Sequence, residues 1–259
     1  MDNNVLEHSA MEMIAQHRSG SRFKNLSQEF QPKNLTDAYE AQDMFHRLSN
    51  RGILGGFKIA LASKVQQELT GVNHPLYGGI FAKEIIMSPA KIPFKSNLSL
   101  GLEFELAVTI SQEITSEAGL FDKNSIRAII DIVCPAFEII IDRGADYVDL
   151  DPMSMVVDNV WCGGVVLGAP VPNWQRIELN KLDATLMWND RPPETALVGD
   201  ANPLDSLVWL INSLLVRNKK IPKGAVIITG SVFKTRNTKI GDQIKYIIGT
   251  NSKVQVDIV

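Results

Sequence analysis

Apolar residues recur at helical spacing in the first part of the chain. The pattern predicts a helix over residues 3–18 and a second over residues 36–52, which Gly52 would end. Asp37 and Glu40 have the spacing of a capping box at the start of the second helix. One side of the first helix would carry Leu6, Ala10, Met13, Ile14 and His17, and the apolar face of the second would be Ala41, Phe45 and Leu48.

Strand-like patterns dominate from residue 55 onward. Apolar runs predict strands, and the clean alternation at the end of the chain predicts a hairpin. The longest helix of this part would begin with Asn202 as its N-cap and Pro203 in its first position. The predicted strands cover residues 55–63, 99–110, 136–142, 163–170 and 224–231, the hairpin covers 243–259, and helices cover 124–133, 202–218 and a brief segment between Ser63 and Gly71.

The order of these elements predicts the fold class. Helices lead, strands follow, and the two do not alternate as regular βαβ units. This order favours an α+β protein with antiparallel or mixed sheets. Because no linker-like composition divides the chain, we expect a soft boundary between an N-terminal helical part, 1–55, and a β-rich core, 56–259, which could form one continuous domain.

Composition narrows the classes of function. The 259 residues are 45% hydrophobic and carry a net charge of −3, so a core can form and nucleic acid is not an expected partner. No apolar run is long enough to cross a membrane, and the acidic N-terminus does not resemble a signal peptide. Cys134 and Cys162 have no metal-type spacing. We therefore expect reduced thiols and a cytoplasmic protein.

Two acids in the segment "SLGLEFELAVTI" are unusual for a buried strand. Glu103 and Glu105 lie two residues apart, so their side chains point to the same face, opposite Phe104. Adjacent carboxylates repel each other unless a cation keeps them ionised, and a hard divalent ion such as Mg²⁺ does so with oxygen ligands. The alternative is a strand with one wet face, on which both glutamates stand in water.

A third acid and one lysine extend this candidate site. Glu138 is the only charge in the apolar stretch "CPAFEIII", where a lone carboxylate is costly to bury without compensation. It could converge with the other two glutamates on one metal, or be a partly exposed strand residue. Lys58, framed by Phe57 and Ile59, could orient a carboxylate or stabilise an enolate. Its alternative is a lysine that extends to solvent from a strand edge.

Familiar catalytic signatures are missing from the chain. There is no phosphate-binding loop, no G-x-S-x-G, no H-E-x-x-H and no C-x-x-C. The four histidines are His8, His17, His46 and His74, and all but His74 fall in predicted helices. Catalysis by a Ser–His pair therefore has little support.

The candidate residues occur together in a known family. The chain resembles the 2-keto-4-pentenoate hydratase and 4-oxalocrotonate decarboxylase family of the fumarylacetoacetate hydrolase superfamily, from about residue 35 to the end. The matching segments are similar to the family's lysine strand, P-x-Y-G loop, E-x-E strand, P-x-x-E strand and D-N motif. In order they read "GFKIALASK", "GVNHPLYGGIF", "GLEFELAV", "PAFEIIIDR" and "VVDNVWCGGVVLG", followed by the late helix, the T-G-S strand and the closing hairpin.

The resemblance implies a fold, a cofactor and an activity. The implied fold is a mixed β-sandwich or roll with an N-terminal helical part, usually in homo-oligomers. The implied activity is that of a lyase that acts on a short 2-oxo or 2-hydroxydienoic acid through a dienolate stabilised by Mg²⁺ or Mn²⁺. The implied site has Glu103, Glu105 and Glu138 as metal ligands, Lys58 as the catalytic residue, and Ser63, Leu76, Cys162 and Thr229 of the Thr229-Gly230-Ser231 turn near the substrate.

Departures from the family pattern leave the reaction open. Family hydratases carry an aspartate where this chain has Leu76, and an aliphatic residue there looks more like the decarboxylases. The bulky Trp161 of Val160-Trp161-Cys162 stands in a stretch where the family has small residues, so the pocket is expected to be reshaped. Hydratase and decarboxylase activities are the two leading hypotheses. An acylpyruvate-type C–C hydrolase and a non-catalytic relative that binds small acids are two further ones.

Overall fold

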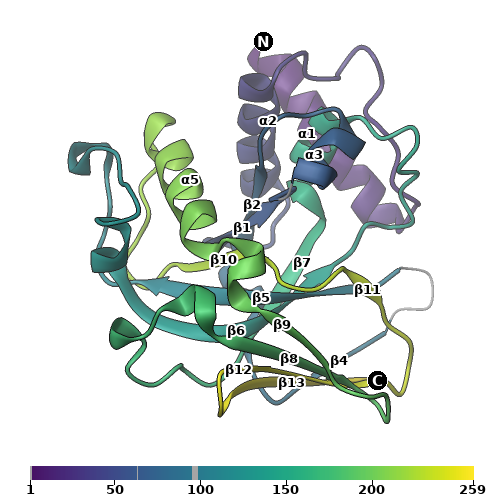
Figure 1. The fold of residues 1–259 in the computed structure, drawn as a ribbon. Helices are drawn as coiled ribbons and strands as arrows, with labels where there is room; N and C mark the ends of the chain where they lie inside the picture. Colours follow the sequence, from purple (N-terminus) through teal and green to yellow (C-terminus); the bar gives the residue numbers. More distant parts are fainter. Residues whose placement is uncertain (1, 63, 95–98) are drawn as a thin grey trace.

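The computed structural model describes residues 2–62, 64–94 and 99–259 (Figure 1). Its strands form a larger and a smaller sheet, and helices cover the larger one. The helices are α1 (Asn3–Ser19), α2 (Leu35–Leu48), α3 (Lys64–Thr70), α4 (Pro152–Val157) and α5 (Pro203–Val216). The strands are β1 (Leu54–Ala60), β2 (Leu76–Phe81), β3 (Ile85–Met87), β4 (Ala90–Ile92), β5 (Gly101–Ile110), β6 (Ile130–Ile140), β7 (Cys162–Leu167), β8 (Asp183–Trp188), β9 (Glu194–Leu197), β10 (Val226–Ser231), β11 (Arg236–Asn237), β12 (Gln243–Ile248) and β13 (Ser252–Ile258).

The two sheets are both mixed. The larger sheet has the order β2-β1-β10-β5-β6-β7-β3, with β11 paired to β5, and its β1–β10 and β3–β7 pairs are parallel. The smaller sheet has the order β4-β13-β12-β8-β9, and only its β4–β13 pair is parallel among the described strands. The predicted α+β class with a mixed sandwich or roll is thereby confirmed.

The N-terminal helices form close to the predicted residues. The side chain of Asp2 caps α1, which ends at Gly20 in a left-handed conformation. The predicted capping box of α2 is wrong, because Asn34 is the N-cap and its side-chain oxygen accepts the backbone N–H of Asp37 at 3.0 Å. The helix also ends before Gly52, since Ser49 already forms its C-cap.

The predicted helix over residues 124–133 is wrong. Residues Ile126–Ile129 form one 3₁₀ turn, and β6 begins at Ile130 and runs through Pro135. The β-branched residues around Ile130 suit a strand, and the pairing of β6 with β5 decides between the two states. Ile130 pairs with Ile110 in this ladder, and Pro135 lies opposite Leu106. A long-range partner that local periodicity does not reveal therefore overrides the helical spacing.

The core divides according to the two faces of the larger sheet. On one face of β5, Phe104 packs edge-on against Phe137 and against Tyr246 of the smaller sheet. The opposite face carries a smaller apolar cluster inside the curled sheet. This inner cluster consists of Ile80, Ala107, Cys134, Ala136, Cys162, Val165, Leu167, Val226 and Ile228. The register places the residues of the candidate site on the same inner face, beyond one end of this cluster.

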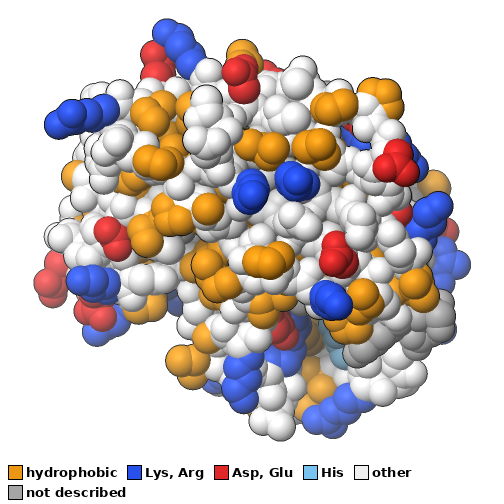
Figure 2. All heavy atoms as spheres, turned by 90° about the horizontal axis from the view of Figure 1, so that it is seen from below, with side chains coloured by type: hydrophobic (Ala, Val, Ile, Leu, Met, Phe, Trp, Pro, Cys, Tyr) orange, Lys and Arg blue, Asp and Glu red, His pale blue; other side chains and the backbone are white. Residues whose placement is uncertain are grey.

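The smaller sheet packs one face, which carries Tyr246, against the larger sheet, and its opposite face points outward. Met187 and Ile247 are half-buried there, next to Lys245 and Thr185 in the ladder between β8 and β12. Figure 2 views the molecule from below and shows apolar side chains mixed with scattered charges over this side. None of the described helices combines the length and the apolar character needed to span a membrane.

Candidate metal centre

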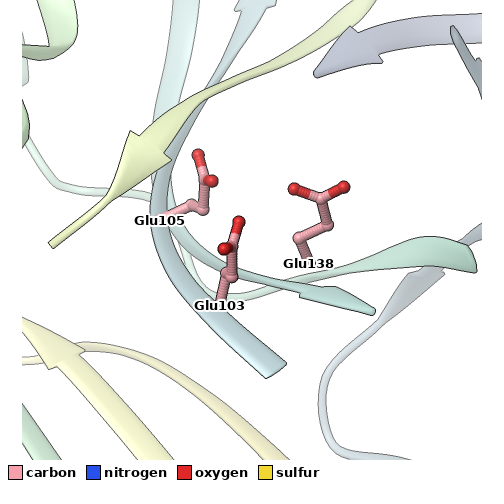
Figure 3. A group of neighbouring side chains, drawn as sticks. All are labelled: Glu103, Glu105 and Glu138. Carbon is pink, nitrogen blue, oxygen red and sulfur yellow. The ribbon is translucent and has the colours of Figure 1, made fainter. Parts of the chain in front are cut away.

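Three glutamates converge inside the curled sheet. Glu103 and Glu105 come from β5, and Glu138 comes from β6, where it pairs directly with Glu103. Each offers a carboxylate oxygen that lies within 4.8 Å of the oxygens offered by the other two. Figure 3 shows the three side chains around one common space. Three convergent carboxylates from two adjacent strands are a donor set that suits a hard divalent cation.

Two of these carboxylates are fully buried. Glu105 and Glu138 both have 0% exposure, and Glu103 is half-buried. Burial raises the pKa of Glu105 well above its ordinary value, and the charges of Glu138 and Glu103 raise it further. Burial also raises the pKa of Glu138 to about 8, although the nearby Lys58 opposes the shift. The wet-face alternative therefore does not describe Glu105, and Glu138 is not a partly exposed strand residue.

The protein supplies few partners to these carboxylates. The backbone N–H of Gly230 donates to Glu105 Oε2 at 2.5 Å, and the hydroxyl of Thr235 donates to Glu103 Oε1. Glu105 Oε1 has no hydrogen-bond partner in the described part of the chain, although it is buried. A buried carboxylate oxygen without a partner is costly. A divalent cation at the centre of the cluster would satisfy it, so the residues fit such an ion.

Lys58 is buried beside the cluster. Its side chain is 2% exposed, and its Nζ lies 3.1 Å from Glu138 Oε1. Burial alone would lower the pKa of Lys58, but Glu138 and Glu103 outweigh it and leave the pKa above its ordinary value. The ammonium group therefore stays charged. The alternative in which this lysine extends to solvent is wrong.

The remaining predicted site residues fall in different surroundings. Leu76 was expected in a loop, but it is the first residue of β2, has 0% exposure and pairs with Ala60. Because Lys58 pairs with Gly78 in the same ladder, Leu76 and Lys58 share the inner face. The thiol of Cys162 lies beside Glu138, and burial raises its pKa to about 12. Ser63 lies outside the described residues.

The Thr229-Gly230 turn contributes through its backbone. The ladder between β10 and β5 shifts register between Ile228 and Ser231. Within this bulge, the hydroxyl of Thr229 donates to the carbonyl of Leu106 at 2.9 Å, so the side chain of Thr229 stabilises the strand. Gly230 adopts φ +110°, which a side chain would strain, and directs its N–H to Glu105.

The D-N motif holds the surroundings of the site in place. Asp158 is buried and accepts from Arg143 Nη2 at 2.7 Å and from His17. The carboxamide of Asn159 exchanges two hydrogen bonds with the backbone of Gly79, at 2.7 and 2.8 Å. These contacts fasten the start of β7 to β2. Residues 159–161 all have positive φ, a backbone path that local sequence patterns did not predict.

Sequence reasoning missed two groups around the cluster. Thr235, which binds Glu103, carries no recognisable signal because it comes from a loop distant in the sequence. Tyr147 donates its hydroxyl to Asp142 at 2.9 Å, and the charge of Glu103 contributes to raising its pKa after burial and Asp142. Asp142 was visible as part of "PAFEIIIDR", but its partner was not.

Comparisons with known proteins agree with the motif resemblance. The chain is 26% identical over 242 residues to a 2-keto-4-pentenoate hydratase of Paraburkholderia xenovorans (strain LB400), covering 91% of this chain and 88% of that protein. It is 25% identical over 234 residues to a 2-oxo-hept-4-ene-1,7-dioate hydratase of Escherichia coli, covering 85% of each. No family model matches the chain.

A solved structure shares the whole fold. The 4-oxalocrotonate decarboxylase from Pseudomonas putida G7, complexed with magnesium and adipate, matches with a TM-score of 0.87. It covers 100% of this chain and 99% of that chain at 21% sequence identity. The predicted resemblance to the hydratase and decarboxylase family is confirmed, and so is the fumarylacetoacetate-hydrolase-like fold. The acidic cluster together with these relatives supports a divalent metal cofactor.

Proposed function

We propose that the protein is a divalent-metal-dependent lyase that acts on a short 2-oxo or 2-hydroxydienoic acid. The leading reaction is hydration of the 2-keto-4-pentenoate hydratase type. The observation that carries the proposal is the buried cluster of Glu103, Glu105 and Glu138 beside the charged Lys58. Relatives named as hydratases cover most of the chain, and both hydration and decarboxylation are lyase reactions.

Glu103, Glu105 and Glu138 would hold Mg²⁺ or Mn²⁺. All three offer hard oxygen donors, and the buried Oε1 of Glu105 lacks another partner among the described residues. When bound, the ion supplies a Lewis acid that stabilises negative charge developing on the substrate's oxygen atoms. Gly230 and Thr235 orient two of the carboxylates, because each donates a hydrogen bond to one of them.

Lys58 has two roles in this proposal. Its ammonium group lowers the cost of ionising Glu138 when a metal binds, since the two buried groups lie 3.1 Å apart. It also presents the positive charge that an anionic substrate needs on this face of the sheet. A substrate enolate beside Lys58 would be stabilised by that charge and could receive a proton from it.

Leu76 favours a second candidate reaction, decarboxylation. Hydration requires a group that positions water and removes its proton, and leucine does neither. Leu76 is fully buried on the inner face that carries Lys58. An apolar wall suits the loss of carbon dioxide, because it does not solvate the departing carboxylate. In the hydratase reaction, the Asp142–Tyr147 pair near Glu103 would have to hold the water instead.

The C–C hydrolase and the non-catalytic relative have weaker support. A C–C hydrolase of this superfamily is expected to use a His–Glu pair to activate water. The histidine rings here bond to Asn4, Asp158, Asn159 and Pro75, and no histidine–glutamate contact is present in the described ranges. The non-catalytic relative rests on the altered stretch Val160-Trp161-Cys162. A cytoplasmic location and a homo-oligomer both stay predictions.

Product analysis tests the proposed activity. The purified protein would be incubated with 2-hydroxypenta-2,4-dienoate and with 2-oxohex-3-enedioate, with and without Mg²⁺, and the products separated by chromatography. We expect metal-dependent turnover of at least one acid, loss of turnover in Glu138→Gln, and no change in Glu113→Gln, which alters an exposed carboxylate outside the cluster. Metal-independent turnover, or equal activity of the two variants, would contradict the proposal.

A further inference from the structure

A cavity lies on the opposite side of β1 from the glutamate cluster. It has a volume of about 200 Å³ and lies between α2, the end of α5 and the outer face of β1 and β2. Figure 1 shows α2 and α5 both rising above β1. Phe57 and Tyr77 line it, and they alternate with Lys58 and Gly78, which face the cluster. The cavity is therefore separated from the proposed catalytic site by the sheet itself.

The charges around this cavity are predominantly positive. Arg217, Lys219 and Lys220 line it together with a single carboxylate, Asp43. His46 adds no charge at neutral pH, because burial lowers its pKa to about 4. Three cations against one anion leave a net positive charge in a partly enclosed space. Such a space attracts small anions.

The guanidinium group of Arg217 is held in a fixed orientation at the cavity. Arg217 donates to the hydroxyl of Tyr77 at 2.6 Å and to Asp43 at 2.9 Å, and its guanidinium group lies over the ring of Tyr39. These contacts use only part of the donor capacity of a guanidinium group, whose planar fork suits a carboxylate. Lys219 also binds Asp43, at 2.6 Å. Lys220 is exposed and has no ion pair within the described chain.

The remaining walls are apolar. Leu54, Phe57, Leu214 and Pro222 line the cavity away from the cations. With this volume the cavity has room for several waters or one small organic molecule. A ligand that matches both parts has one compact anionic group and a short apolar body.

We propose that this cavity binds a small carboxylic acid, with its carboxylate at Arg217 and Lys220 and its apolar body against Phe57 and Leu214. The site is independent of the metal cluster, because its residues come from the other face of the sheet and include none of the three glutamates. Free phosphate shares the anionic chemistry but lacks the apolar body. Benzoate, succinate and inorganic phosphate therefore serve as separate probes.

A pair of charge reversals gives a matched test. Lys220 lines the cavity, whereas Lys223, also exposed, follows three residues later and does not. Isothermal titration of metal-free protein with benzoate is expected to show saturable binding in the wild type and in Lys223→Glu. Lys220→Glu should bind at least about tenfold more weakly, because a repulsive charge replaces an attractive one at the ligand. Both variants change the net charge equally.

A third variant separates this site from the metal centre. Glu138→Gln alters the cluster but leaves the cavity lining intact, so it should bind benzoate like the wild type. Binding in the wild type should also weaken as sodium chloride is added. The proposal would be overturned by the absence of saturable binding, by equal weakening in both lysine variants, or by loss of binding in Glu138→Gln alone. Tighter binding of phosphate than of benzoate would overturn the choice of a carboxylic acid.

Discussion

Metal binding to the glutamate cluster should displace protons. Burial raises the pKa of Glu138 to about 8, so at neutral pH the metal-free protein holds a proton there for most of the time. A divalent ion needs the ionised carboxylate and must expel this proton. The apparent affinity for Mn²⁺ is therefore expected to rise with pH until the pKa of Glu138 is passed.

The structure gives the size of this effect. With a pKa of about 8, competition from one proton weakens metal binding roughly a hundredfold at pH 6 and about twofold at pH 8. The dissociation constant for Mn²⁺ should thus fall roughly fiftyfold between these two pH values. Glu105 steepens the dependence, since its pKa is also raised well above the ordinary value.

Calorimetry measures both the dissociation constant for Mn²⁺ and the number of protons that binding releases. Titrations with Mn²⁺ at pH 6, 7 and 8, each in two buffers with different ionisation enthalpies, give the dissociation constant and the number of protons released. At least one proton should be released at pH 6. Glu113→Gln, which removes an exposed carboxylate, should behave like the wild type. A dissociation constant that does not change with pH, together with no proton release, would refute the reasoning.

The raised pKa of Glu138 also predicts how the folding stability of the metal-free protein depends on pH. The pKa of Glu138 is raised from an unfolded-chain value of 4.5, so the folded metal-free protein binds the extra proton between about pH 4.5 and pH 8. Folding stability contributed by this residue is therefore present below pH 4.5 and is lost as pH rises toward 8. Bound metal should reverse the loss, because it stabilises the ionised form.

The remaining predictions concern single residues of the site. Glu105→Gln should weaken Mn²⁺ binding about tenfold or more in calorimetry, as expected for loss of a charged ligand, and an unchanged affinity would contradict its role. Lys58→Met should lower kcat at least about a hundredfold and, because it removes the buried partner of Glu138, should also lower the melting temperature of the metal-free protein. Leu76→Asp should increase hydration of 2-hydroxypenta-2,4-dienoate relative to decarboxylation of 2-oxohex-3-enedioate; efficient hydration by the wild type that the change does not affect would show that Leu76 does not select the reaction. Gly230→Ala should reduce thermal stability and metal affinity together, since alanine is strained at φ +110° and its Cβ would lie 3.2 Å from that of Ala62.

The acidic cluster could be predicted because it depends on a simple rule. Alternation along one strand was enough to place Glu103 and Glu105 on the same face, and the apolar neighbours of Glu138 marked it as unusual. The resemblance to the family then implied that all three acids bind one metal, although the sequence does not show how the strands pair. What the sequence did not contain was the pairing of β5 with β6, which brings Glu138 directly opposite Glu103.

β2 and the first half of β6 are among the strands that the sequence did not predict, and both depend on pairing with another strand. The segment from residue 124 has helical spacing, but its residues from Ile130 onward pair with β5, the preceding strand, and local periodicity does not reveal this pairing. β2 was missed because "LYGGIF" contains two glycines, which local propensity assigns to turns. The close packing of Gly78 and Gly79 against Asn159 and His46 explains both glycines, and these contacts exist only in the folded chain.

The bulge in β10 links the fold to the site. The register of the ladder between β10 and β5 shifts between Ile228 and Ser231. At this bulge the hydroxyl of Thr229 donates to the carbonyl of Leu106, and the N–H of Gly230 donates to the carboxylate of Glu105. One irregularity thus supplies a backbone donor to a buried carboxylate without leaving that strand carbonyl unpaired. The hydrogen bond from Gly230 favours the ionised form of Glu105 and orients its carboxylate. A metal ligand at this position requires both.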